Sequence, residues 1–285
     1  MSLYRLEHPL PALDRPVVVA AFDGWVDAGT AASSALALIG GSSAVVATFD
    51  ADVLYDYRAR RPTLEIRDGR PATLEWPELR LRHARIGGRD LLILGGPEPD
   101  FRWHALSADL FELLGRLGAR EWISLGAIPA AVPHARPVPI LGTESELGLL
   151  KGEVSAGPTG LLRVPAAALS VLEMASVEAG LPAVGYFAQV PHYVTGAYAP
   201  ASVALLRTLE KHLEVELPRG DLVEEAGRLR ARLDAAVAAD ETTRSYVQRL
   251  EAMVDEERQP AGDDLISDIE RFLREGRSGD GGTRG

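Results

Sequence analysis

The sequence contains no cysteine, and only Lys151 and Lys211 of its 30 basic residues are lysines. The lack of cysteine excludes disulfides, thiolate nucleophiles, iron–sulfur clusters and cysteine-ligated zinc. The scarcity of lysine removes most candidates for a mechanism that depends on a lysine amine. There is also no run of 18 apolar residues, so the sequence predicts no membrane span.

The first 20 residues hold Glu7, two arginines and three prolines and have no continuous apolar stretch, so they do not resemble a signal peptide. We therefore expect a cytoplasmic protein. The formal net charge of −11 argues against non-specific binding to nucleic acid or to anionic lipid, because both need basic surfaces. We expect neither nucleic acid nor a membrane as a partner.

Several catalytic signatures are missing as well. No G-x-S-x-G elbow, no G-x-x-x-x-G-K-[ST] loop, no G-x-G-x-x-G after the first predicted strand and no H-E-x-x-H pair occurs. The histidines lack the close spacing of metal ligands. We therefore expect no metal and no cofactor, and the sequence leans away from an enzyme.

What is present divides the chain into parts. Charged residues make up 44 of the first 218 positions but 27 of the last 67. The sequence predicts an α/β core over residues 1–218, a charged helical extension over 219–275 and a disordered tail over 276–285, which is glycine-rich and lacks large apolar residues.

The extension carries an apolar stripe at alternating spacings of four and three residues, which is typical of a helix that packs on one face. The stripe consists of Leu222, Ala226, Leu229, Leu233 and Ala236. The pattern continues after a break at residues 240–243 and again after Pro260, so the extension is expected to form two or three helices in all. The later apolar positions are Tyr246, Leu250, Met253, Leu265, Ile269 and Phe272. These helices are expected either to recruit a partner or to cover an apolar face of the core or of an oligomer.

The first 218 residues alternate between short apolar runs and helical segments that end at glycine. The expected strands are residues 17–22, 44–49, 90–94, 122–125 and 183–190. The expected helices are residues 28–39, 107–117, 165–178 and 202–213. This order predicts a mainly parallel sheet in a three-layer α/β fold with helices on both faces. Residues 63–86 depart from it, because they alternate apolar and polar side chains around Asp68-Gly69 and so predict an antiparallel insert. We expect this insert to form an interface.

Ligands of open parallel sheets bind at the carboxyl ends of the strands, so the loops that follow the strands are the candidate pocket. The predicted pocket residues are Asp23, Trp25, Asp27, Glu98, His134, Thr159, His192 and Tyr193. Each has a structural alternative: Asp27 and Thr159 suit helix caps, Trp25 suits a gap filler between loops, and the Glu98 loop suits a well-packed turn. A catalytic reading requires the acidic and histidine side chains to converge.

Four of these loops together resemble the PAC2 family, whose members are similar to proteasome assembly chaperone 2. The segments are residues 22–29, 94–99, 157–162 and 189–193, and the resemblance spans roughly residues 15–215. It implies a phosphorylase/hydrolase-like α/β fold, self-association into a homo-oligomer, and a role related to assembly of the 20S proteasome. Assembly chaperones of this kind often dock through a C-terminal hydrophobic-Tyr-any motif. This sequence ends in Gly-Gly-Thr-Arg-Gly, so we expect no docking of that type.

Two functions from different classes remain at this stage. The first is a non-enzymatic, self-associating scaffold or assembly-chaperone-like protein with a proteasome-related partner. The second is a small-molecule binder or a hydrolase/phosphorylase-like enzyme that takes a nucleoside- or phosphate-type ligand in the strand-end pocket.

Overall fold

The computed structural model describes residues 2–7, 10–41, 43–157 and 160–257. The chain divides into two compact units, residues 1–233 and 234–285. Several predicted features lie outside the described residues: Thr159 of the pocket, the helix expected after Pro260, and the tail at 276–285.

A nine-stranded mixed sheet forms the centre of the first unit, with the order β1-β3-β6-β7-β2-β8-β11-β9-β10. The neighbours β7, β2, β8 and β11 run parallel to one another, and antiparallel strands flank them. The strands are β1 (Tyr4–Leu6), β2 (Val17–Asp23), β3 (Ala44–Phe49), β6 (Arg80–Ile86), β7 (Arg89–Pro97), β8 (Glu121–Ala130), β9 (Ile140–Glu144), β10 (Ser155–Ala156) and β11 (Ala183–Pro191).

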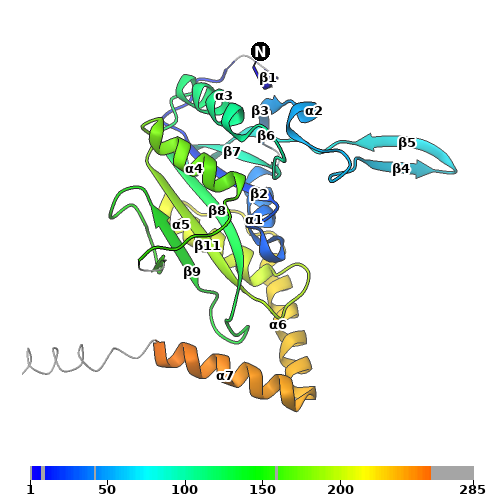
Figure 1. Cartoon of the computed structure of the whole chain (residues 1–285), viewed down its shortest axis with the longest axis vertical. Helices are drawn as coiled ribbons and strands as arrows, with labels where there is room; N and C mark the ends of the chain where they lie inside the picture. The colour runs from blue at the N-terminus through cyan, green and yellow to red at the C-terminus, as the bar shows by residue number, and fades with distance from the viewer. Residues whose placement is uncertain (1, 8–9, 42, 158–159, 258–285) are drawn as a thin grey trace, which may run out of the picture. The chain divides into compact units, whose positions relative to one another are not determined.

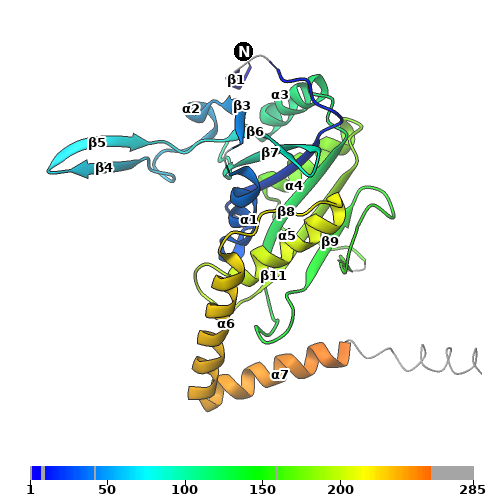
Figure 2. The same ribbon diagram turned by 180° about the vertical axis from the view of Figure 1, so that it is seen from behind.

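Helices cover both faces of this sheet. α1 (Ala31–Gly40) and α5 (Ala199–Leu213) pack on one face, together with the odd-numbered residues of β2. α3 (Trp103–Arg116) and α4 (Ala168–Glu178) pack on the other face, together with the even-numbered residues of β2. Figure 1 views the face of α3 and α4, and Figure 2 views the face of α5 from behind. The α/β fold with helices on both faces is confirmed.

The central strands are nearly pure apolar runs because both of their faces are buried. Residues 17–22 of β2 are each at most 2 % exposed, and β7 and β8 carry similar runs. Such continuous burial is the signature of parallel strands between two helical layers. Two short helical turns complete the unit: the 3-10 turn η1 (Ala28–Thr30) leads into α1, and α2 (Ala51–Leu54) follows β3.

The predicted insert separates into two pieces. β6 joins the main sheet between β3 and β7, whereas β4 (Thr63–Arg67) and β5 (Arg70–Glu75) pair only with each other. Their turn is the predicted Asp68-Gly69, with φ of 50° and 73°, as a two-residue type I′ turn requires. Figure 1 shows this hairpin extending away from the nine-stranded sheet.

The sheet contains strands that the sequence pattern did not predict. β1, β9 and β10 are short and lie at or near the sheet edges, and β8 runs five residues past the predicted end at Leu125. The extra length of β8 pairs with β11 up to Ala130, which brings the following loop beside the end of β11.

The predicted helical extension begins as α6 (Leu222–Ala239), followed by α7 (Glu241–Glu257). Within the first unit, Leu222, Leu229 and Leu233 of the predicted stripe pack against the core. The predicted break falls at Asp240, whose carboxylate accepts a hydrogen bond from the backbone N–H of Thr243 at 2.7 Å. In the described part of the chain, no helix has the length and apolar character to span a bilayer.

Candidate functional site

Asp27 is held as a helix cap at the end of the β2 loop. Its Oδ1 accepts hydrogen bonds from the backbone N–H groups of Ala32 at 2.8 Å and Ser33 at 3.2 Å, in the first turn of α1. Burial raises the pKa of Asp27, although its hydrogen bonds with Ser33 and Ala32 oppose the shift. The contacts of Asp27 are therefore those of a helix cap, which is the structural role that the sequence allowed for it.

Glu98 joins the β2 loop to the other helical layer. Its Oε2 accepts from the backbone N–H of Trp25 at 2.9 Å, and its Oε1 accepts from the backbone N–H of Ala168, at the start of α4, at 2.7 Å. A Cβ at Gly24 would lie 2.4 Å from Oε2, so only glycine leaves room for this carboxylate. Glu98 is 9 % exposed and both of its oxygens are occupied by backbone donors.

The carboxylates of Asp27 and Glu98 are thus directed at different partners. Asp27 bonds to α1 and Glu98 bonds to α4, and these helices cover opposite faces of the sheet. Asp23, the last residue of β2, is exposed and lines a cavity of about 380 Å³ beside Arg82 and Gly96. The Trp25 ring is 68 % exposed and fills no interior gap.

The second group of predicted residues gathers where β8 and β11 end. The hydroxyl of Tyr193 accepts the backbone N–H of His134 at 2.7 Å and lies 2.7 Å from Nδ1 of the same histidine. Which of the hydroxyl and Nδ1 donates in the second contact is set by the tautomer of His134. The Nδ1 of His192 lies 3.0 Å from the carbonyl of Ala130, and its ring meets that of Tyr193 edge-on.

The structure therefore brings the predicted residues together in two groups that link backbone segments. The side chains of Asp27, Glu98 and His192 bond to main-chain groups, and the Tyr193 hydroxyl accepts the main-chain N–H of His134, which stabilises the loops. In the described ranges, no three histidine or acidic side chains are placed to hold a metal ion. These contacts hold the loops in place at this edge of the sheet.

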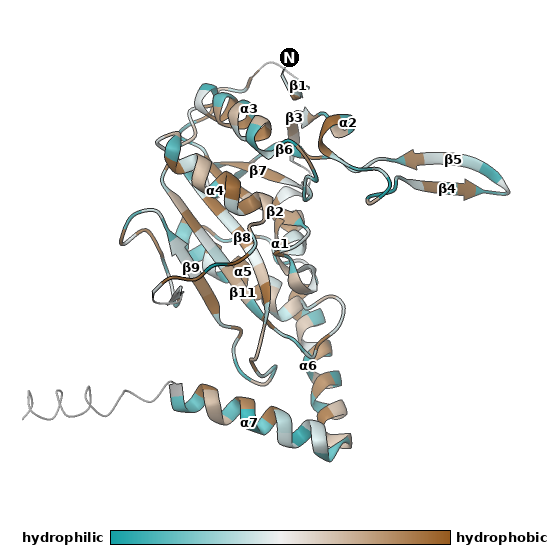
Figure 3. Ribbon diagram, viewed as in Figure 1, coloured by the Kyte–Doolittle hydropathy of each residue, from teal (hydrophilic) through white to brown (hydrophobic). Residues whose placement is uncertain are grey.

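The side chains of the β4–β5 hairpin, unlike those of Asp27 and Glu98 at the strand ends, are exposed to solvent. Every residue of both strands is exposed, and the large apolar side chains are exposed to between 47 % and 64 %. These are Leu64, Ile66, Leu74 and Trp76. Residues 63–76 are called the arm below. Figure 3 shows hydrophobic stretches on both of its strands.

The apolar side chains share one face of the arm. Leu64 lies directly opposite Leu74, and Ile66 follows two positions after Leu64, so alternation places them together. Glu65 and Thr73, on the intervening positions, bond to each other at 2.8 Å. A two-stranded hairpin without a packing layer is marginal in water, and an exposed apolar face of this kind marks an interaction surface.

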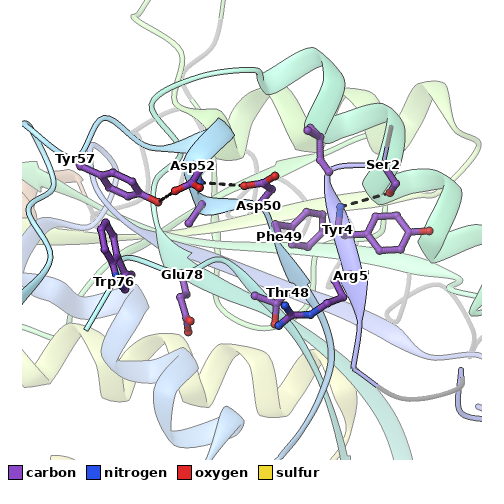
Figure 4. A pocket seen from close by; sticks show the side chains of 12 residues that line it. Ser2, Tyr4, Arg5, Thr48, Phe49, Asp50, Asp52, Tyr57, Trp76 and Glu78 are labelled. Carbon is purple, nitrogen blue, oxygen red and sulfur yellow. Dashed lines mark hydrogen bonds between the residues drawn. The ribbon is translucent and has the colours of Figure 1, made fainter. Parts of the chain in front are cut away.

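The base of the arm is fixed to the core. The ring of Tyr57 meets that of Trp76 edge-on at 4.6 Å, and the hydroxyl of Tyr57 donates to Oδ1 of Asp52 at 2.6 Å (Figure 4). Burial and the Asp52 carboxylate raise the pKa of Tyr57 to about 12, so the hydroxyl stays a proton donor at neutral pH. The arm is therefore anchored at its base.

A groove of about 690 Å³ lies at this anchor, called the root groove below. It is lined by β1, the end of β3, the start of α2, and Tyr57 and Trp76 (Figure 4). Its charged residues are Arg5, Asp50, Asp52 and Glu78, so the groove combines aromatic walls with a net negative charge. This lining favours a partner segment that carries apolar and basic side chains.

Sequence reasoning located the insert but not the root groove, because β1 and α2 reach it only through the fold. It also missed a cationic cavity beside α5. The available signal there was Lys211, one of the two lysines, at a helical spacing of four from Arg207.

The fold and these two regions define a three-layer α/β protein with a projecting arm, and comparisons assign it to a family. The PAC2 family profile matches residues 21–237, so the chain belongs to the PAC2 family. No curated protein matches the sequence.

Solved structures extend this result. A protein of unknown function from Corynebacterium glutamicum is 29 % identical, with 90 % of this chain and 98 % of that one covered and a TM-score of 0.83. A protein of unknown function from Mycobacterium tuberculosis is 34 % identical, with coverages of 89 % and 91 % and a TM-score of 0.82. A proteasome-assembly chaperone homologue from M. tuberculosis is 35 % identical, with coverages of 81 % and 99 % and a TM-score of 0.72.

Proposed function

We propose that this protein acts as an assembly chaperone for a proteasome-type subunit and that it works by binding rather than by catalysis. Its membership of the PAC2 family, with a proteasome-assembly chaperone homologue among its relatives, supports an assembly-chaperone-like role. The observation that carries the proposal is the arm, whose apolar face is exposed on both strands.

The size of this face favours a transient partner. Stable complexes bury about 1,200–2,000 Å² in total. Four half-exposed side chains on a narrow hairpin supply only a part of that area. A chaperone must release its client after assembly, so a small apolar contact flanked by the acidic root groove suits that task.

A non-enzymatic role also agrees with the strand-end loops. The polar groups that a hydrolase would use there bond to backbone atoms of their own scaffold. Self-association, which the family resemblance predicts, is part of the proposal and is measured separately.

The decisive experiment mixes the purified protein with purified 20S α- and β-subunits of its source organism. The rate of 20S assembly is followed on native gels, and binding to the isolated α-subunit is measured by biolayer interferometry. We expect wild-type protein to bind and to accelerate assembly. The variant Ile66→Glu, which places a charge on the apolar face, should weaken binding about tenfold or more, because hot-spot residues lie at such apolar centres.

Arg67→Glu is the matched control. It introduces the same side chain one position away on the polar face and removes the like-charge opposition of Arg67 and Arg70 across the hairpin. We expect it to bind as the wild type does. Absence of binding to the α- and β-subunits by the wild type would refute the proteasome link, and equal losses in both variants would refute the role of the apolar face. Light scattering of the free protein reports self-association in the same samples.

A further inference from the structure

A cavity of about 400 Å³, separate from the root groove, lies between α5, the first half of α6 and the chain that leads into β9. Apolar side chains form part of its wall, including Val138, Ile140, Val203 and Ala204. Its volume falls within the range of about 300–1,000 Å³ that is typical of small-molecule sites.

The charge of this cavity is opposite to that of the protein as a whole. Four cationic side chains line it, from the β8–β9 loop, α5 and α6, against the single carboxylate of Glu153. They are Arg136, Arg207, Lys211 and Arg230. The chain carries a formal net charge of −11, so a concentration of positive charge in one concave region creates a local attraction for anions.

Two of these cations are placed unfavourably unless an anion joins them. Arg207 and Lys211 are four residues apart on α5, where like charges repel each other. Arg207 makes no hydrogen bond or ion pair with any residue that the structure describes. The ammonium of Lys211 lies 3.8 Å from the carboxylate of Glu153, whose side chain is 98 % exposed, so this pair neutralises little.

Tyr198 provides an independent indication of a ligand. It is only 1 % exposed and lines the cavity, yet its hydroxyl has no hydrogen-bond partner among the described residues. Burial raises its pKa to about 12, and the positive charge of Arg230 acts in the opposite direction, which places the guanidinium near the phenol. A phenol hydroxyl that lines the cavity without a protein partner can bond to a ligand oxygen there.

Arg230 is fixed in this position. Its Nη1 donates to the carbonyl oxygen of His134 at 2.8 Å. His134 is in turn held by Tyr193 through the two contacts described above. The wall that faces the phenol is therefore rigid before any ligand arrives, which lowers the entropic cost of binding.

We propose that this cavity binds a phosphate monoester that carries an apolar or aromatic body. A phosphate monoester has a charge of about −1.5 to −2 at pH 7, which matches several converging cations better than a carboxylate does. Arginine suits phosphate through its planar, bidentate donors. The apolar wall accommodates the organic part. This site is independent of the arm and of the assembly role.

Isothermal titration calorimetry at low salt with phenyl phosphate tests the proposal, with inorganic phosphate, phenol and benzoate as comparators. We expect phenyl phosphate to bind about tenfold more tightly than any comparator, because only it combines both features. Its affinity should fall as the ionic strength rises. A weak ligand still binds measurably at a concentration of about 10 mM. No binding of phenyl phosphate at that concentration, or equally tight binding of benzoate, would overturn the assignment.

Variants locate the site. The double variant Arg207→Gln/Lys211→Gln should bind phenyl phosphate about tenfold or more weakly, since each charge-assisted hydrogen bond is strong. Tyr198→Phe should weaken binding about threefold to tenfold and should leave the ligand-free melting temperature close to that of the wild type, because the hydroxyl makes no hydrogen bond to a described residue. The control Arg228→Gln, on α6 but outside the cavity lining, should bind as the wild type does. A loss in Arg228→Gln that equals that of the double variant would refute the location.

Discussion

The loops at the carboxyl ends of the central strands and the arm use their side chains in opposite ways. At the strand ends, two carboxylates and the imidazole of His192 bond to the main chain, as Glu98 does with Trp25 and Ala168. On the arm, apolar side chains extend into solvent without a packing layer. Polar residues on loops at a sheet edge can therefore be structural, whereas apolar residues on an exposed hairpin point to a partner.

The largest effect that separates the two regions is expected for Glu98→Ala. It leaves the buried backbone N–H of Ala168 and the part-buried N–H of Trp25 without their acceptor, so the free energy of unfolding should fall by about 3 kcal/mol in urea titration. Glu75→Ala on the arm removes an equally charged but exposed side chain and should change stability by less than about 0.5 kcal/mol. Equal effects for the two variants would erase the distinction.

Gly24→Ala should have the next largest effect. The new Cβ would meet Glu98 Oε2 at 2.4 Å and displace the carboxylate, at an expected loss of about 2 kcal/mol. Gly227→Ala on α6 is the control, because a Cβ there meets nothing within 4 Å. That change should stabilise the protein by up to about 1 kcal/mol through helix propensity. A Gly24→Ala protein as stable as the wild type would show that the Glu98 side chain can move aside at little cost.

A smaller effect should appear with pH at the start of β7. The backbone N–H of Asp14 chiefly lowers the pKa of Asp90 against the effect of burial, and His83 adds to the lowering. A lowered pKa in the folded state means that this contribution is complete above pH 3.8 and is lost as the pH falls through the folded-state value. The free energies of unfolding of the wild type and of Asp90→Asn, measured by chemical denaturation, should therefore converge as the pH is lowered. A constant difference between them would contradict this role.

The smallest effect is expected from removal of the arm. Thr63 and Glu75 lie opposite each other, so an Asn-Gly turn can replace residues 64–74. The free energy of unfolding of the core should stay within about 0.5 kcal/mol of the wild-type value, since the deleted residues are exposed. A clearly destabilised core would mean that the arm belongs to the fold rather than to a partner surface.

Much of the fold followed from local pattern. The continuous apolar run at residues 17–22 predicted a strand buried on both faces, and Asp68-Gly69 predicted the hairpin turn, because each signal is contained in neighbouring residues. The short strands β1, β9 and β10 were missed because they depend on pairing with distant strands.

The sites were less accessible to sequence reasoning. The sequence placed Glu98 in a strand-end loop, but only the fold shows that its acceptors face Trp25 and Ala168. The cationic cavity draws Arg136, Arg207 and Arg230 from three elements far apart in the chain. No local spacing encodes that convergence, which arises from the packing of α5 and α6 beside β9.

The turn of the arm makes a protease a reporter of occupancy. Exposed loop tips are preferred sites of nicking, and the turn places Arg67-Asp68 at the tip. Of the two arginines there, Arg70 precedes Pro71, a bond that trypsin does not cut, so Arg67-Asp68 is the bond in the arm that trypsin cuts. Protection of this bond from trypsin when a client covers the hairpin would then record binding in the unmodified protein.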